Sequence, residues 1–462
     1  MRRQGSILVG VLWCMVLLSL VVIGVLHTAR MDLSVVQNYG DRVQAHYLAL
    51  AGVERAKALL YRDTVTRQQT SKSHTGSLYD DAKDFENVPL GRGRFQVFRR
   101  ARSSDGGGIV YGISDEESRL NVNTVSLEQL TNNSSLLGMK PEIAAAIVAW
   151  RSPETQVTSG GAQTEYYMSL RPPYQARNGP FQTVRELLMV RGVTRELLLG
   201  NDRNQNGFLD SDDDLEDQGP RRSAAEDTSD AGWFPLLTVV ATEKNVSAGG
   251  KDRVNPQTAD QAALTGIAGI TPAIARAIIS YRGQHALQTL GDLLDVTAAQ
   301  NQRGQTGNAA TEGGGSSSSG SAQTGSGSSG SGQPVISEDL LIQIADDLTL
   351  DGGTDLTGLI NINTASAEVL DCLPAIDPTL AQGIVSHRKS SGFFANVAGL
   401  LKVEGMTHDK FKQVVPLITA RSETYRIVSE GKVDSTGARQ RIEEIVHIGR
   451  RDLETLSYRE DL

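Results

Sequence analysis

Oxygen donors with the spacing of a calcium-binding loop lie in the segment DRNQNGFLDSDDD, residues 202–214. The pattern D-x-N-x-N-G places side-chain ligands at alternate positions and a glycine at the sixth, where such loops turn sharply. The expected ligands are Asp202, Asn204, Asn206, the backbone carbonyl of Phe208, Asp210 and Asp213. The sequence therefore predicts a calcium ion with a structural role within residues 201–219.

Two features distinguish this segment from a paired calcium sensor. Its twelfth position is Asp213 where a bidentate glutamate is usual, and helices flanking the loop are not evident. We therefore expect a stand-alone loop whose crowded carboxylates repel one another until a cation neutralises them. The alternative is a solvated acidic loop without metal, which does not account for Gly207 and Leu209.

Catalytic groups show no assembled pattern in the sequence. It contains no glycine-rich phosphate loop followed by Lys-Ser/Thr, no G-x-S-x-G and no H-E-x-x-H. The 7 histidines are scattered, and the only cysteines, Cys14 and Cys372, lie in separate contexts that predict neither a disulfide nor a metal-ligand pair. We expect no enzymatic activity. The net charge of −9 also disfavours general attraction to nucleic acid.

A long N-terminal helix is the first element expected to organise the chain. The run from Ser6 to Leu26 has no charged side chain, and a helix of this length spans about 30 Å, the hydrocarbon thickness of a bilayer. Arg2 and Arg3 precede it, which predicts a cytoplasmic N-terminus. Apolar spacing continues, so we expect one transmembrane and amphipathic helix over residues 6–62. A cleaved secretory signal fits poorly at the exit GVLHTAR; a plain single-pass anchor is an alternative.

This helix, behind a five-residue basic leader (residues 1–5), resembles the N-terminus of type IV pilins and type II secretion pseudopilins. The resemblance implies that a prepilin peptidase cuts after Gly5, leaving Ser6 as the first mature residue, and it implies methylation. Major pilins carry glutamate at the fifth mature position, whereas this chain has Gly10. In lacking this carboxylate, the chain resembles the K-type minor pseudopilin, a tip subunit with no partner above it. An unpaired carboxylate in lipid would be costly for such a subunit.

Three copies of one helical pattern follow the N-terminal region. They open with LNVNT, RVNPQT and ININT; each continues with a short helix, a tight turn and a second helix that ends in arginine. The equivalent residues are Thr124, Thr258 and Thr364 before the first helices and Arg151, Arg282 and Arg388 at the ends of the second. We predict helical modules over residues 119–200, 253–300 and 359–420.

The repeated pattern resembles the helix-hairpin-helix family, whose best-known members aim backbone amides of a Gly-hydrophobic-Gly turn at a DNA phosphate. The turns here read Gly138-Met139-Lys140, Gly269-Ile270-Thr271 and Ala375-Ile376-Asp377, so none keeps the second glycine. The three arginines are open to interpretation as phosphate contacts, but arginine near a helix C-terminus also complements the helix dipole. The K-type resemblance instead implies a protein-contact insert in a pilin domain, with bound calcium.

The remaining segments indicate a tether and a sheet. Residues 311–333 are a glycine and serine tract, expected to be a flexible tether between the second and third modules. Strand-like alternation predicts two parts of a sheet, within residues 90–118 and 423–452. One sheet packed on the N-terminal helix is favoured because a lone hairpin is marginal, with two small domains as the alternative. The predicted fold is α+β: a pilin helix on a small antiparallel sheet with a large inserted all-α region.

These features together predict a K-type minor pseudopilin of a type II secretion system. By resemblance it caps the tip of a periplasmic pseudopilus and supports its assembly for protein export. The implied partners are the I- and J-type minor pseudopilins, the prepilin peptidase and the inner membrane, with the bulk of the chain periplasmic and no nucleic acid. The competing hypotheses are a membrane-anchored DNA receptor of the competence type and a plain anchored scaffold with no filament role.

Overall fold

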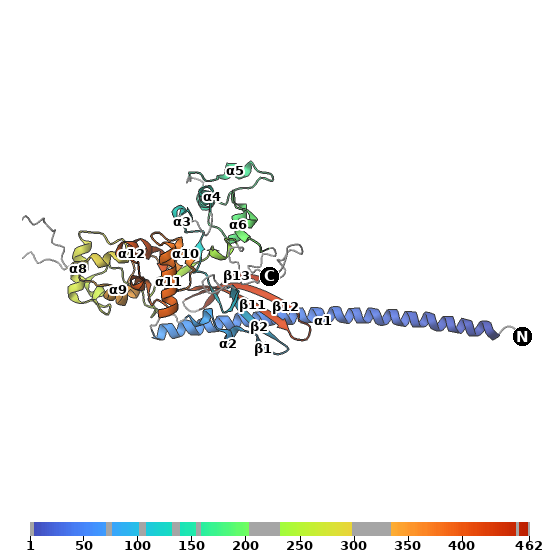
Figure 1. Cartoon of the computed structure of the whole chain (residues 1–462). Coiled ribbons are helices and arrows are strands. Elements are labelled where there is room, and N and C mark those ends of the chain that lie inside the picture. Colours follow the sequence, from blue (N-terminus) through green and yellow to red (C-terminus); the bar gives the residue numbers. More distant parts are fainter. Residues whose placement is uncertain are drawn as a thin grey trace, which may run out of the picture.

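The computed structural model describes residues 4–70, 76–100, 108–131, 139–153, 159–202, 232–297, 334–449 and 452–460. A long N-terminal helix forms one side of the molecule, and an antiparallel sheet packs on its C-terminal half (Figure 1). Three helical modules extend from the sheet and beyond the end of this helix. The expected α+β fold, with helical insertions, is therefore confirmed.

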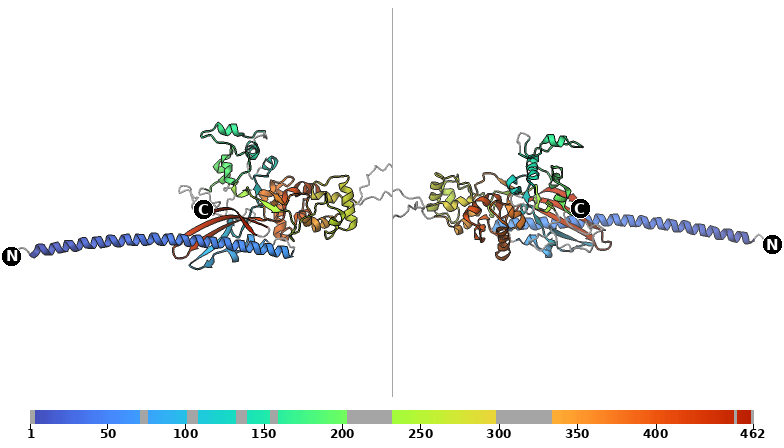
Figure 2. Two further views of the ribbon diagram at one scale, coloured as in Figure 1. Left: turned by 180° about the vertical axis from the view of Figure 1, so that it is seen from behind. Right: turned by 45° about the horizontal axis from the view of Figure 1, so that its top comes forward.

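Helix α1 runs from Gln4 to Thr70, past the expected end at residue 62. Buried apolar side chains begin at Ala45 and recur at helical spacing on the face toward the sheet. They are Ala45, Leu48, Ala49, Val53, Ala56, Leu59 and Leu60. Before Ala45 the apolar side chains are exposed, and this half of α1 extends from the molecule as a bare rod in every view (Figure 1 and Figure 2).

Within the described residues, the sheet on α1 has 7 strands, drawn from both ends of the sequence. Its main order is β1-β2-β11-β12-β13, with β3 paired to β2 and β4 paired to β11. The strands are β1 Val88–Leu90, β2 Gly93–Arg100, β3 Ile109–Tyr111, β4 Ser114–Asp115, β11 Thr424–Val433, β12 Arg439–Ile448 and β13 Leu453–Glu460. Antiparallel pairing of β2 with β11 joins the two predicted parts into one sheet. Strand β13 lies beyond the expected boundary at residue 452.

The helix and the sheet approach closely because each places a glycine against the other. A Cβ atom at Gly431 of β11 would lie 2.1 Å from the carbonyl oxygen of Ala45. A Cβ atom at Gly52 of α1 would lie 2.2 Å from the hydroxyl oxygen of Ser429. Side chains at these positions would therefore push α1 away from β11.

The modules are chains of short elements. The first contains β5 Leu120–Asn121, α3 Leu127–Thr131, α4 Pro141–Arg151, α5 Thr164–Met168, η3 Val184–Met189, α6 Arg195–Leu199, η5 Phe234–Leu236 and β6 Leu237–Thr238. The second contains β7 Thr242–Lys244, α7 Gln261–Thr265, α8 Pro272–Arg282, η6 Leu290–Asp295, α9 Glu338–Ile344 and η7 Ala345–Asp347. The third contains β8 Asp355–Thr357, β9 Ile360–Asn361, α10 Ala367–Asp371, α11 Pro378–Ser391, η8 Val397–Lys402, α12 His408–Val414, η9 Val415–Leu417 and β10 Ile418–Thr419. Two short elements, η1 Ser77–Tyr79 and α2 Ala82–Phe85, follow α1 in the sequence and precede β1.

The second module continues after the glycine and serine tract. Val254 forms a parallel bridge with Leu348, and Thr297 forms an antiparallel bridge with Pro334. The residues that flank the tract therefore meet inside the second module, and not between the second and third modules as expected. One hydrophobic core, separate from the core between α1 and the sheet, runs through all three modules.

Candidate functional site

The predicted calcium loop begins at the edge of the described structure. Asp202 follows α6 and is buried; its carbonyl oxygen accepts a hydrogen bond of 2.8 Å from Arg195. The other expected ligands, Asn204, Asn206, Phe208, Asp210 and Asp213, lie outside the described residues. Among the residues that are described, no group of three or more His, Cys, Asp or Glu side chains is placed to hold a metal ion. The calcium site stays a prediction.

The predicted processing residues Gly5 and Ser6, and Gly10, lie near the start of α1. Gly10 is exposed, and a Cβ atom there would have nothing within 4 Å. Packing within one chain therefore gives no steric reason for glycine at this position. By length and composition, α1 is able to cross a membrane, and it is the one helix of the described part of the chain with this property.

An arginine closes each helical module by donating to a backbone carbonyl. The three pairs are Arg151 with Val122, Arg282 with Pro256 at 2.7 Å and Arg388 with Ile362 at 2.9 Å. In every case the carbonyl belongs to the segment that opens the module. These guanidinium groups, considered from the sequence as phosphate contacts, tie the end of the second helix to its own module.

An amide side chain completes this closure. In the third module, Asn363 donates to the carbonyls of Phe394 at 3.0 Å and Ala420 at 2.9 Å, and accepts from the Phe394 N–H at 2.8 Å. Asn123 makes the equivalent bonds in the first module, and Gln257 accepts one backbone N–H in the second. The repeated NVNT and NINT sequences are therefore structural signatures of the module.

The hairpin turns of the second and third modules differ in the residue that caps the next helix. Gly269 and Ala375 occupy the same turn position and both have left-handed backbone, with φ of 103° and 59°. The next helix is capped by Thr271 in the second module and by Asp377 in the third. Asp377 accepts the Leu380 N–H at 2.9 Å, and this bond is the main cause that lowers the pKa of Asp377. A carboxylate therefore occupies the place where a DNA phosphate would bind, and it would repel one.

Three consecutive carboxyl groups, Asp115, Glu116 and Glu117, are buried where the sheet meets the modules. We call them the acidic triplet. Asp115 ends β4, and its Oδ2 accepts hydrogen bonds from Asn361 at 2.9 Å, from Ser422 at 2.6 Å and from Thr364. Its Oδ1 accepts the Glu117 N–H at 2.8 Å. Asp115 thus fastens the third module to the sheet.

Glu116 connects the first module to β11. It accepts hydrogen bonds from Arg426 Nε at 2.7 Å and from Thr238 Oγ1 at 2.5 Å. Burial alone would raise the pKa of Glu116, but the charges of Arg426 and Arg119 outweigh it and hold this pKa at about 2. Arg426 also reaches Glu443 of β12 at 3.2 Å. The buried charge of Glu116 is therefore paired with an opposite charge, as stability in the interior requires.

Glu117 differs from Glu116 because backbone N–H groups, and not a guanidinium group, are its hydrogen-bond partners. It accepts backbone N–H groups from Glu423 at 3.3 Å and Thr424 at 3.2 Å. Burial, together with the adjacent charge of Asp115, raises the pKa of Glu117 well above its ordinary value. Glu117 therefore keeps its proton to a higher pH than an exposed glutamate does.

A second polar cluster joins the second and third modules. Arg421 contacts Glu243 at 3.1 Å and Asp346 at 3.3 Å, and Arg253 contacts Glu243 at 3.3 Å. Thr419 donates a further hydrogen bond to Glu243. Two guanidinium groups and two carboxylates therefore balance one another.

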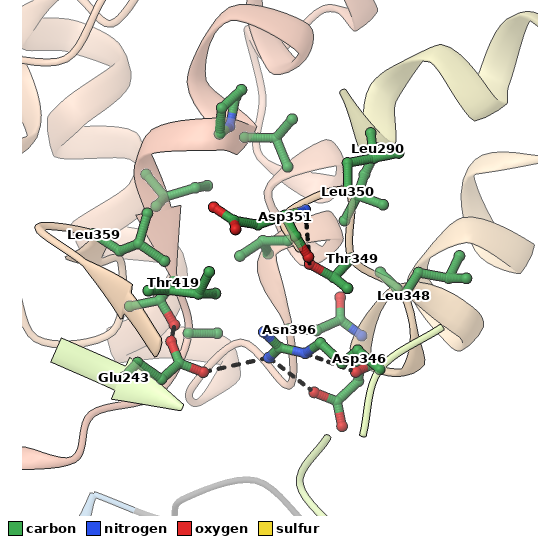
Figure 3. A pocket seen from close by; sticks show the side chains of 18 of the residues that line it. Glu243, Leu290, Asp346, Leu348, Thr349, Leu350, Asp351, Leu359, Asn396 and Thr419 are labelled. Atoms are coloured by element: carbon green, nitrogen blue, oxygen red, sulfur yellow. Dashed lines mark hydrogen bonds and ion pairs between the residues drawn. The ribbon is translucent and has the colours of Figure 1, made fainter. Parts of the chain in front are cut away.

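A cavity of about 380 Å³ lies beside this cluster, between the second and third modules (Figure 3). Leu290 and Leu350 line it on one side and Leu359 on the opposite side, with Glu243 and Asp346 at the lower end of the view. The volume falls in the range of small-molecule sites. Four of its five charged lining residues, Glu243, Asp346, Arg253 and Arg421, form ion pairs with one another that join the modules; the fifth is Asp351.

Sequence reasoning missed the acidic triplet. Its signal was a run of three acidic residues directly before the first module, and such a run usually marks a solvated surface. Burial becomes possible because Arg426, 310 residues later in the chain, supplies the opposite charge to Glu116. This pairing carries no local spacing from which it could be derived.

Comparisons with known proteins agree with parts of this description. Residues 110–200 match the family model "Type II secretion system (T2SS), protein K", and residues 357–419 match the model of the helix-hairpin-helix motif. The chain is 32% identical to ComE operon protein 1 of Bacillus subtilis (strain 168) over 71 residues, 15% of this chain and 34% of that protein. It is 27% identical to the endonuclease/exonuclease/phosphatase family domain-containing protein 1 of Bos taurus over 192 residues, 41% of this chain and 32% of that protein. The chain thus spans about a third of the length of these curated relatives.

A solved structure is similar over a longer stretch. It is the GspK-GspI-GspJ complex from the type 2 secretion system of enterotoxigenic Escherichia coli, with a TM-score of 0.42 and 12% identity, covering 94% of this chain and 99% of that chain. From its matches to family models, the chain carries a domain of the type II secretion system protein K family together with a helix-hairpin-helix motif.

Proposed function

We propose that this protein is a K-type minor pseudopilin that caps the tip of a periplasmic pseudopilus and supports its assembly for protein export. Its work is assembly and not catalysis. The observation that carries the proposal is the exposed half of α1, whose apolar residues have no partner in the described part of the chain. Val36, Tyr39, Val43 and Tyr47 are exposed at helical spacing beyond the candidate membrane span. Such a stripe is suited to packing against the helices of other subunits.

The position of the modules supports a place at the tip. The second module lies beyond the C-terminal end of α1, and the third module lies over that end, opposite to the N-terminus (Figure 1). In a filament of parallel α1 helices, this end points away from the membrane. A subunit stacked above would have to pass the modules, so the modules close the filament. Gly10 agrees with this position because a tip subunit has no neighbour to pair with a carboxylate there.

The proposed life cycle starts in the inner membrane. The apolar part of α1 holds the chain there with its N-terminus in the cytoplasm, and the prepilin peptidase cuts after Gly5 to leave Ser6 first. The I- and J-type minor pseudopilins are the proposed direct partners, since they accompany the K type. The match over residues 110–200 supports this choice.

The decisive experiment is mass spectrometry of the mature N-terminus in cells that contain the prepilin peptidase. A mature protein that begins at Ser6 supports the proposal, and a protein that keeps residues 1–5 contradicts it. Gly10→Glu tests the tip position, with Gly10→Gln as the uncharged control. We expect the glutamate variant alone to reduce recovery of the complex with the I- and J-type partners, because its charge would be buried without a partner.

The DNA-receptor hypothesis has one observation in its favour, the helix-hairpin-helix match over residues 357–419. The closed turns oppose it, since Asp377 occupies the expected phosphate position of the third module. A gel shift of the full chain with duplex DNA at low salt separates the two functions. Binding that weakens steeply as salt is added would favour the DNA receptor.

We also propose a structural calcium ion within residues 202–213. Bound calcium stabilises the state that binds it. The melting temperature of the full chain should therefore rise with calcium relative to a chelator, and the rise should disappear in the Asn204→Ala/Asn206→Ala variant. Asn301→Ala, outside the acidic loop, is the control and should keep the rise. Equal melting temperatures of the unaltered chain in both buffers would refute the site.

A further inference from the structure

The first module carries an exposed surface that combines aromatic, thioether and cationic side chains. Tyr166 of α5 is 37% exposed and Met189 of η3 is 43% exposed. Tyr174 and Arg191 lie beside them, half-buried, and the exposed Arg171 precedes Tyr174 by three residues. We call these five residues the tyrosine patch. It stands on the side of the sheet away from α1 (Figure 1 and Figure 2).

The tyrosine patch is held in place from below. Tyr167 is fully buried, and its ring contacts Tyr166 edge-on at 5.2 Å and Tyr174 at 5.4 Å between centroids. The Arg191 guanidinium lies 5.4 Å from the centre of the Tyr166 ring. The Tyr174 hydroxyl donates to the Met189 carbonyl at 2.8 Å. A surface fixed in this way loses little conformational entropy when it binds.

The arginines of the patch lack carboxylate partners among the described residues. Arg177, their neighbour in sequence, pairs with Glu186 at 2.5 Å, whereas Arg171 and Arg191 form no such ion pair there. The guanidinium group of Arg191 instead donates to the carbonyl of Gly160 at 2.5 Å. Glu165 is exposed next to Tyr166 but forms no ion pair with either arginine in the described structure. Arg191, half-buried against the Tyr166 ring, and the exposed Arg171 thus place two positive charges on this module of a chain with net charge −9.

We propose that the tyrosine patch docks a second protein through a segment that places Asp or Glu next to aromatic or aliphatic side chains. Tyrosine, arginine and methionine are enriched at protein interfaces, and tyrosine and arginine supply most binding hot spots. The carboxylates pair with Arg171 and Arg191, and the apolar side chains cover Tyr166 and Met189. A nucleic acid fits less well, because two cations neutralise few phosphates. This surface is distinct from the α1 stripe of the proposed function and does not depend on it.

The test measures binding of two labelled peptides to the full chain in detergent by fluorescence polarisation. One peptide alternates Glu or Asp with Phe or Leu, and the other replaces each acid by its amide. We expect the acidic peptide to bind at least about tenfold more tightly than the amide peptide, and Arg171→Ala and Tyr166→Ala each to weaken it about tenfold. Arg62→Ala, which removes an exposed cation from α1, is the matched control and should bind as the unaltered chain does. Circular dichroism verifies that each variant is folded.

Three results would overturn this proposal. If the two peptides bind equally well, or if neither binds, the carboxylates do not pair with Arg171 and Arg191 as proposed. Displacement of the acidic peptide by a single-stranded oligonucleotide, with tighter binding of the oligonucleotide, assigns the surface to nucleic acid. Self-association of the chain in sedimentation, abolished by Arg171→Ala, assigns it to a second copy. A protein that is never processed at Gly5 would sink the proposed function but leave this result unchanged.

Discussion

The first and third modules close in the same way but end in different surroundings. Each uses an arginine on a backbone carbonyl and an asparagine that bonds two distant backbone segments. In the third module Arg388 and Asn363 are buried, whereas Arg151 and Asn123 of the first module are half-buried. The third module is fastened to the sheet through Asp115, and the first carries the exposed tyrosine patch. One local pattern therefore serves both a fixed core and an outward arm, and its surroundings decide which.

Removing the Asp115 carboxylate should produce the largest effect. Asp115→Ala leaves four buried donors without their acceptor, and the expected loss of stability is about 3–5 kcal/mol. Hydrogen exchange should accelerate most in residues 360–424, and least in the first module. Asp80→Ala, at an exposed position, is the control. Equal acceleration in the two modules would show that Asp115 does not favour the third.

Truncating the closing arginines should separate the two modules by burial. Arg388→Ala should cost about 2–3 kcal/mol, because the Ile362 carbonyl stays buried without its donor. Arg151→Ala should cost about 1 kcal/mol, since water reaches its half-buried site more readily. Urea denaturation followed by segment-resolved hydrogen exchange measures both. A larger cost for Arg151→Ala would reverse the comparison.

The two glutamates of the acidic triplet should respond to pH in opposite directions. The folded pKa of Glu117 is raised, so the folded chain loses stability as pH rises above its ordinary value of 4.5. Glu117→Gln has no carboxyl group to titrate and so avoids this loss. The free energy of unfolding of the variant, relative to that of the unaltered chain, should therefore increase with pH. Chemical denaturation from pH 4.5 upward provides the measurement. A stability difference that does not change with pH would argue against a raised pKa of Glu117.

Glu116 has the opposite sign because its folded pKa is depressed to about 2 from 4.5. Its charge contributes stability above pH 4.5 that is lost as pH falls toward 2. Glu116→Gln should therefore be less stable than the unaltered chain at neutral pH, with a deficit that shrinks across this acid range. The same denaturation series tests it, and a constant deficit would contradict the assigned ion pair with Arg426.

The smallest expected effect concerns the hairpin turns. Ala375 adopts a left-handed backbone that disfavours a Cβ atom, so Ala375→Gly should change stability by less than about 1 kcal/mol, in the favourable direction. Gly269→Ala should be unfavourable by about 1 kcal/mol, because its Cβ would lie 3.1 Å from Leu340 Cδ1. Thermal unfolding compares the two. Destabilisation by Ala375→Gly would show that the methyl group packs usefully.

Much of the fold follows from patterns that are local in the sequence. The continuous helix, the three modules and the strands β2, β11 and β12 all have spacing that shows which side is apolar. Strand β13 was missed because its sequence, LETLSYRE, lies at an exposed edge and shows little apolar alternation. The extension of the second module past the tract was also missed, since Val254 and Leu348 meet only in three dimensions.

The sequence by itself determined the α+β class, the long apolar helix and the repeated modules, because hydrophobic periodicity and capping act within a few residues. Only the tertiary structure decided that Asp115, Glu116 and Glu117 are buried, and that Arg151, Arg282 and Arg388 donate to backbone carbonyls. The physical reason is that a charge enters the interior only when a partner is already there. The partners of a buried charge come from parts of the chain that only folding brings together. Arg426, the partner of Glu116, is an example.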